Sequence, residues 1–318
     1  MVKNREGVVV FSRQAAPNIN YVMQARTLFV ALVTLVVIFS IPFFRSGNSS
    51  WVEMNPYLQG MTLSLAAALL CQAYFSFRLG NALLLLFISL TVSLAAESMG
   101  LRWAWPFGSQ YHYNPAIGPT LPGGVPLCIP VTWFMLAYTA LAFLGPFTVR
   151  PGGLLSYRRV LLKAVLCALF ITAADFVIDP LAVKYEAWFW HQPGGYFGVP
   201  PGNFAGWFIV AFLICGGTIL LEKPRHGYRY RDHISLDVPF AVTSISLTSI
   251  CLEESVIRTG SALPVALALT FMAPCWLYWL ASLIQSRRGA VRFQGRGIEK
   301  IGEFQRVQEA GIILEREG

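Results

Sequence analysis

Eight apolar stretches, each about long enough to cross a bilayer, recur along this sequence and limit the folds open to it. A helix needs about 20 apolar residues to cross a hydrocarbon core of roughly 30 Å, and lipid cannot form hydrogen bonds with an exposed backbone. The stretches are too long and too uniformly apolar for barrel strands. The sequence therefore predicts an all-α fold, a polytopic transmembrane helical bundle of about eight spans. These are residues 27–44, 58–77, 81–97, 126–149, 159–181, 204–221, 236–257 and 263–284.

Composition and charge agree with a membrane protein and indicate its orientation. The chain is 55% hydrophobic and only 13% charged, whereas a soluble domain is about 25% charged. Its net charge of +8 follows the positive-inside rule, because basic residues gather on one side of the predicted spans. The other side receives only Arg45, Arg102, Lys184 and Arg258. This asymmetry predicts that both termini are cytoplasmic, and it accounts for the positive charge without a nucleic-acid site.

The chain is expected to divide into three parts. Residues 1–26 form a cytoplasmic N-terminal segment, 27–284 the transmembrane domain, and 285–318 a basic cytoplasmic tail that could touch anionic lipid. The first span lacks a small-residue cleavage site and is expected to be a retained helix.

Two loops on the predicted non-cytoplasmic side differ from the others. Residues 96–130 and 174–207 combine proline and glycine turns with a high density of aromatic side chains. An interfacial aromatic belt is one explanation, since membrane proteins commonly carry one. The acidic residues predicted at the same depth favour a second explanation, because acids are costly there and usually face a cavity or a partner.

Five carboxyl groups are predicted to converge at this side of the bilayer: Glu97, Asp175, Asp179, Glu253 and Glu254. Asp175 and Asp179 are four residues apart and share one helical face. Carboxyl groups that are close together and partly desolvated cannot all stay ionised, so at least one is expected to hold a proton. Such an acid could protonate an alkene, and electron-rich rings would stabilise the resulting cation. A helix cap or a hydrogen bond to a loop amide is the structural alternative for each acid.

Missing motifs limit the chemistry further. The sequence contains no P-loop, no GxGxxG after a strand and no GxSxG. Its four histidines lie in loops without the paired spacing of di-iron enzymes, and its six cysteines form no CxxC pair. We therefore expect no cofactor and no metal.

A group of motifs between about residues 90 and 210 resembles a known family. They are AESMG around Glu97, FGSQYHY from Phe107 to Tyr113, GP at Gly118, VPLCIPVTW ending at Trp133, DP at Asp179, WFW at Trp188 and GYFGVPPGNFAGW ending at Trp207. Together they resemble the integral-membrane carotenoid biosynthesis family that includes the bisanhydrobacterioruberin and γ-carotene C-1′,2′ hydratases.

The resemblance implies a hydro-lyase that needs no cofactor. Such an enzyme adds water to the terminal C1–C2 double bond of an acyclic ψ-end carotenoid. Asp179 or Asp175 would be the acid and Glu97 the group that activates water. The hydrophobic carotenoid or polyprenoid substrate would contact Tyr111, Tyr113, Trp133, Trp188, Trp190, Tyr196, Asn203 and Trp207. The implied location is a prokaryotic inner membrane, where lipid and other carotenoid pathway enzymes are the expected partners.

Two alternatives stay open at this point. A cofactor-independent terpenoid or carotenoid cyclase or isomerase would begin with the same protonation but would quench the cation with an internal double bond. A transporter or lipid-binding protein would use the acids to bind protons or a cationic ligand, although no inverted repeat, common in transporters, is evident.

Overall fold

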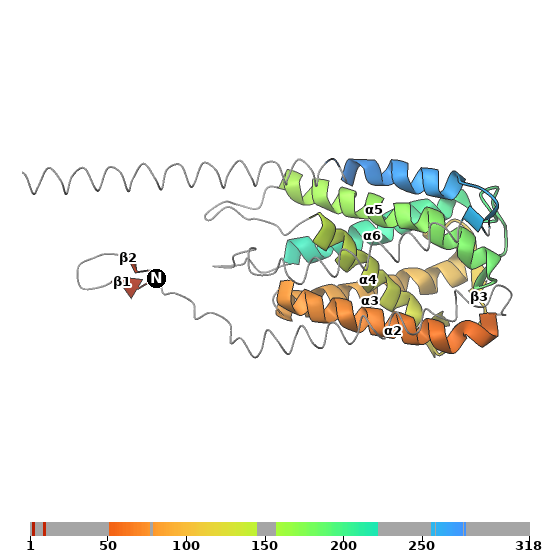
Figure 1. Cartoon of the computed structure of the whole chain (residues 1–318), viewed down its shortest axis with the longest axis horizontal. Helices are drawn as coiled ribbons and strands as arrows, with labels where there is room; N and C mark the ends of the chain where they lie inside the picture. The colour runs from red at the N-terminus through yellow and green to blue at the C-terminus, as the bar shows by residue number, and fades with distance from the viewer. Residues whose placement is uncertain are drawn as a thin grey trace, which may run out of the picture.

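The computed structural model describes residues 2–3, 9–10, 51–76, 79–144, 157–221, 256–257, 259–275 and 277, and within them the protein is mostly helical. Five labelled helices run roughly along the long axis of the molecule (Figure 1): α2 (Trp51–Ser76), α3 (Leu79–Trp103), α4 (Cys128–Phe143), α5 (Tyr157–Lys184) and α6 (Pro201–Leu221). A further helix, Leu263–Cys275, lies beside α5 and is drawn in blue. Its Cys275 thiol donates to the Leu166 carbonyl of α5 at 3.2 Å.

Three of these helices, α3, α5 and α6, are long and apolar enough to cross a membrane. Large apolar side chains on α3 also point outward, as Phe87 does with 66% of its surface exposed. Exposed apolar side chains suit a lipid environment, whereas soluble proteins rarely gather them. The protein is thus a helical membrane protein.

Six of the eight predicted spans overlap described helices, with shifted boundaries. Helix α3 continues to Trp103, beyond the predicted end at residue 97. Helix α4 has 16 residues, or about 24 Å, which is less than the thickness of a hydrocarbon core. The predicted span 27–44 and nearly all of 236–257 lie outside the described residues, so the number eight stays a prediction.

Small side chains allow the long helices to approach closely. Helix α5 packs chiefly against α6, and α3 packs against both α4 and α6. A Cβ added at Gly216 of α6 would lie 3.4 Å from the Ala164 Cβ of α5. Small residues at such contacts bring backbones together where no hydrophobic effect drives helix association.

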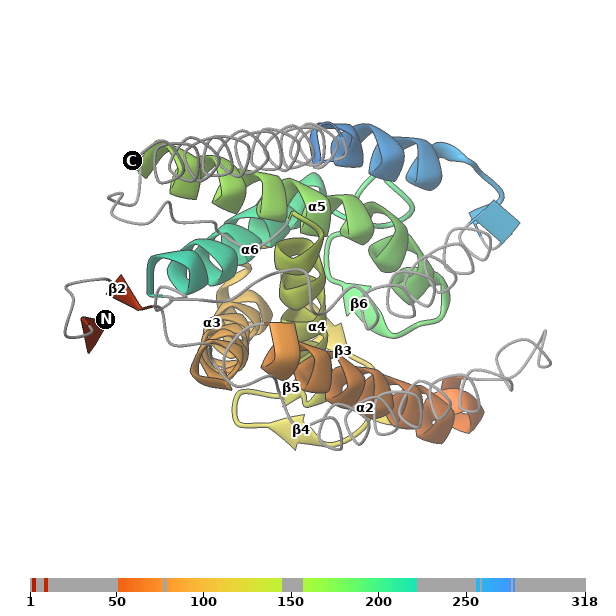
Figure 2. The same ribbon diagram turned by 60° about the vertical axis from the view of Figure 1, so that its left-hand side comes forward.

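Short antiparallel strands join the two aromatic loops. Strand β3 (Tyr111–Tyr113) pairs with β6 (Trp188–Trp190), and both strands are labelled in Figure 2. In this pairing Tyr111 is opposite Trp190. The other pairs are β4 (Thr120–Leu121) with β5 (Val125–Pro126), and β1 (Val2–Lys3) with β2 (Val9–Val10). A 3-10 helix, η1 (Pro115–Ile117), follows β3. The two loops, which the sequence predicts on the same side of the bilayer, are thus hydrogen-bonded to each other, although the sequence analysis did not foresee strands.

The alternation of strand side chains separates an inner from an outer face. Tyr111 and Trp190 are buried, whereas His112 and Phe189 are exposed and stack with their rings 5.1 Å apart. Successive side chains of a strand point to opposite faces. Both strands consequently present aromatic rings toward the helical bundle.

Candidate functional site

Glu97 is buried near the C-terminal end of α3, with 4% of its surface exposed. Its Oε1 accepts from the Trp133 indole nitrogen at 2.9 Å, and its Oε2 accepts from the Tyr113 hydroxyl at 2.7 Å. The Tyr111 hydroxyl also donates to Oε2. A carboxylate offers about four acceptor positions, so three donors fill most of them.

The two phenols act as donors because they keep their protons. Burial raises the pKa of Tyr111 well above its ordinary value, and the nearby charge of Glu97 adds to the shift. The same two causes raise the pKa of Tyr113. A hydrogen bond from a neutral donor to a carboxylate favours the ionised form of the acid. The three donors therefore offset part of the cost of burying a negative charge at Glu97.

Asp175 and Asp179 form a second buried group on α5. They expose 0% and 1% of their surfaces. The Asn203 side-chain nitrogen, at the start of α6, donates to Asp175 Oδ2 at 2.8 Å and also to Asp179 Oδ2. Oxygens that reach one nitrogen lie within roughly two hydrogen-bond lengths, or 6 Å, of each other. One neutral amide cannot neutralise two negative charges, so the geometry suits a pair of carboxyl groups that share a proton.

The two groups belong to one site. Glu97 is close enough to interact electrostatically with both aspartates, and Asp179 interacts with Tyr111 in the same way. Three acids from two helices are thus gathered beneath the paired strands.

Pro180 explains why a tyrosine from the second loop contacts α5. Proline has no N–H, so inside a helix it leaves the carbonyl four residues earlier without its normal donor. That carbonyl belongs to Phe176, and it accepts a hydrogen bond of 2.8 Å from the Tyr196 hydroxyl. Tyr196 therefore connects the loop to the helical turn that carries Asp179.

Glycines position the first loop over the acids. A Cβ at Gly100 or at Gly206 would lie 2.6 Å from the Phe107 ring, so this ring is held between α3 and α6. Gly108 has φ +79° and approaches Gly202 of α6 closely, a contact and a conformation that favour residues without a Cβ. Phe107 in turn packs edge-on against Tyr111 at 5.9 Å.

Aromatic rings surround the three acids. The Trp133 and Trp207 rings are 4.4 Å apart, and the Tyr111 and Trp190 rings are 4.8 Å apart. Trp188 packs edge-on against Tyr113 at 6.0 Å. These faces could stabilise a cation that formed between them.

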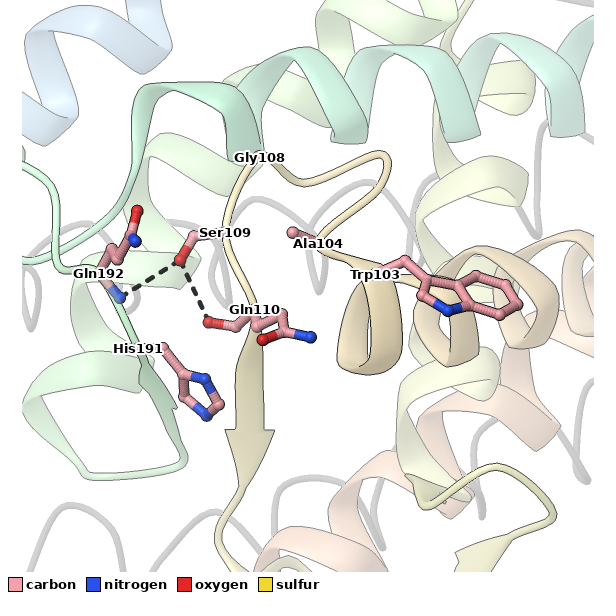
Figure 3. Close-up of a pocket in the computed structure, with 7 residues that line it drawn as sticks. All are labelled: Trp103, Ala104, Gly108, Ser109, Gln110, His191 and Gln192. Atoms are coloured by element: carbon pink, nitrogen blue, oxygen red, sulfur yellow. Dashed lines mark hydrogen bonds between the residues drawn. The ribbon is translucent and has the colours of Figure 1, made fainter.

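A separate pocket of about 210 Å³ lies on the loop side (Figure 3). The Ser109 hydroxyl at its wall donates to the Gln110 carbonyl at 3.2 Å and accepts from the Gln192 backbone nitrogen at 3.3 Å. The pocket is lined by Trp103, Ala104, Gly108, Ser109, Gln110, His191 and Gln192, and none of the three acids is among them.

The structure shows which partners the predicted substrate-binding residues have. The polar atoms of Tyr111, Tyr113 and Trp133 donate to Glu97, and the Asn203 side-chain nitrogen donates to the two aspartates. That these residues also contact substrate stays a prediction. Trp188, Trp190, Tyr196 and Trp207 do lie around the acids, whereas Glu253 and Glu254 are outside the described residues.

A model of the carotenoid biosynthesis protein family matches residues 59–274, which include all the elements of this site. The chain belongs to this family. The chain is 33% identical over 131 residues to the bisanhydrobacterioruberin hydratase of Haloarcula japonica, a region that covers 40% of this chain and 42% of that protein. The alignment thus spans about two fifths of each protein. No solved structure matches the chain significantly.

The family's description places the chain among carotenoid biosynthesis proteins. Within the described residues, no three His, Cys, Asp or Glu side chains are grouped as a metal site would need. That activity requires neither a metal nor a cofactor stays a prediction.

Proposed function

We propose that this protein is a carotenoid hydratase that adds water across the terminal C1–C2 double bond of an acyclic ψ end group. The observation that carries the proposal is the buried cluster of three acids. Glu97 accepts several hydrogen bonds on one side of the cluster, and Asp175 and Asp179 share the Asn203 amide on the other. The name of the Haloarcula japonica relative supports hydration as the outcome.

The two halves of the cluster suit two roles. The aspartate pair would supply the proton to C2, which leaves a tertiary cation at C1. The negative charge at Glu97 and the surrounding indole and phenol rings would stabilise that cation. A carboxylate would take the proton that water releases, so acid and base are both present without a cofactor.

The test is expression in a host that makes lycopene, followed by mass spectrometry of the pigments. A hydratase produces pigments heavier by one or two water molecules, one for each end group. A cyclase or isomerase would instead give a new pigment of unchanged mass, and a transporter or lipid-binding protein would leave lycopene unaltered. Either of these last two results would contradict the proposal.

A further inference from the structure

Thr172 of α5 is a buried polar residue to which the reaction outlined above gives no role. Only 3% of its surface is exposed, and its hydroxyl has no hydrogen-bond partner within the described part of the chain. An unpaired hydroxyl in an apolar interior costs free energy.

Five other helical threonines form a hydrogen bond within their own helix. Their hydroxyls donate to the backbone carbonyl four residues earlier, a local bond typical of threonine in helices. Thr218, for example, is also buried and donates to the Ile214 carbonyl at 2.8 Å. The others that do so are Thr91, Thr132, Thr139 and Thr270. The Thr172 hydroxyl departs from this pattern and is free to bind another group.

A second unpaired atom lies on the same helical face. Asp175 Oδ1 is buried and has no partner among the described residues, because Asn203 binds the other oxygen, Oδ2. Residues three apart are neighbours on a helix, and side chains lean toward the preceding turn. The Asp175 carboxyl therefore leans toward the turn that carries Thr172.

We propose that Thr172 and Asp175 bind the water molecule that is added to the carotenoid. Three residues of helix rise about 4.5 Å, and one water with two hydrogen bonds of about 2.8 Å spans up to roughly 5.6 Å. The hydroxyl would orient the water, and Oδ1 would accept its proton. This inference rests on the proposed hydratase function and assigns the water to the α5 side of the site, away from Glu97.

The steps balance without any further reactant. Asp179 gives its proton to C2, and the alkene π electrons form the new C–H bond. A lone pair of the bound water forms the C1–O bond, and the water proton passes to Asp175. Transfer of that proton from Asp175 to Asp179 restores the pair, so the net change is the addition of one water.

Substitution of Thr172 by Val separates capture of the cation from its formation. Valine has nearly the same shape but lacks the hydroxyl, so protonation at C2 should continue while water is poorly placed. Misplacing a reacting group by about 1 Å can cost around 100-fold. In membranes suspended in D2O, we expect T172V to form hydrated pigment about 10- to 100-fold more slowly. We also expect deuterium at C2 of the recovered substrate. A cation that water does not capture loses a proton from C2 and becomes the alkene again, and the deuterium added at C2 can remain there.

Two variants serve as controls. T172S keeps the hydroxyl and should restore hydration, which a requirement for shape alone would not explain. T218V removes a buried hydroxyl whose bond goes to its own helix, and it should hydrate as the unmodified protein does. The ratio of hydrated product to deuterated substrate does not depend on the amount of protein that accumulates. If T172V accumulates poorly, the same ratio is read for T172A.

Two results would overturn the water site: hydration by T172V at the unmodified rate, or loss of hydration without deuterium at C2. Failure of the unmodified protein to hydrate would instead contradict the proposed function itself.

Discussion

At the scale of single residues, hydrogen-bond partners distinguish three acids that look alike in the sequence. Glu97 receives hydrogen bonds from one indole and two phenols, whereas Asp175 and Asp179 share a single amide donor. Abundant donors favour a carboxylate, and scarce donors favour a carboxyl group that keeps its proton. The acid that protonates the alkene is therefore expected on α5.

Replacing Asp179 by Asn should abolish most activity and leave the fold intact. The amide keeps the size of the side chain, and its oxygen can still accept from Asn203, but it has no proton to transfer. General acid catalysis contributes about 100- to 10,000-fold, and we expect a loss of that order in the rate of pigment hydration. Glu186→Gln is the matched control, since this acid is exposed in the neighbouring loop. Normal accumulation of D179N together with nearly unmodified turnover would transfer the role to Asp175 or Glu97.

The sequence predicted the acids of the site but not their partners. Glu97, Asp175 and Asp179 could be found because a charge in an apolar span is costly and thus conspicuous. Their donors come from residues 14 to 36 positions away from Glu97 and 24 to 28 positions away from the aspartates, and such pairings depend on the tertiary fold. Thr172 was missed because a threonine in an apolar helix normally bonds its own backbone.

At the scale of elements, the end of α5 depends on the loop that packs against it. Pro180 removes one helical hydrogen bond, and Tyr196 supplies the missing donor to the Phe176 carbonyl. The sequence shows a proline inside a predicted span, but it gives no sign of which side chain compensates for the lost hydrogen bond. Likewise, the alternation in YHY and WFW is typical of strands, yet neither segment identifies the other as its partner.

Removing the Tyr196 hydroxyl should destabilise the protein through that carbonyl. An unsatisfied buried acceptor costs about 1–3 kcal/mol, so Tyr196→Phe is expected to lower the free energy of unfolding in detergent by that amount. Pro180→Ala restores an N–H for Phe176, and in this background the same Tyr196→Phe change should cost clearly less. A double-mutant cycle measures this coupling, and equal costs in both backgrounds would refute the compensation.

The packing of the Phe107 ring between α3 and α6 gives a second prediction, which concerns the first aromatic loop. Gly206→Ala would place a Cβ 2.6 Å from the Phe107 ring and 2.9 Å from the Pro106 carbonyl oxygen. The loop would have to shift, and Tyr111 with it, so we expect a marked loss of pigment hydration. Gly217→Ala on the same helix meets its nearest atom at 3.9 Å, an ordinary contact, and should retain activity. Comparable activity in the two variants would show that the loop tolerates displacement.

At the scale of the whole molecule, the strand pairing constrains how the chain crosses the membrane. Strands β3 and β6 belong to loops that follow α3 and α5, and they are hydrogen-bonded to each other. Both loops must then lie on one side of the bilayer, which requires an even number of crossings between them. The apolar composition predicts the spans, and the basic residues predict the side, but only the pairing joins the two loops into one site.

Reporter fusions test this arrangement directly. Truncated chains that end at Gly124 or at Lys184 and continue into alkaline phosphatase should both give active, non-cytoplasmic reporter, because each of the two aromatic loops carries a single basic residue, Arg102 or Lys184. A fusion after Leu221, at the opposite end of α6, should be inactive as phosphatase and fluorescent as a green fluorescent protein fusion. If the Gly124 and Lys184 fusions report opposite sides, β3 and β6 cannot pair in the membrane. That result would contradict a single site built from the three acids and the two loops. If both report the cytoplasm, the pairing survives and only the predicted orientation is wrong.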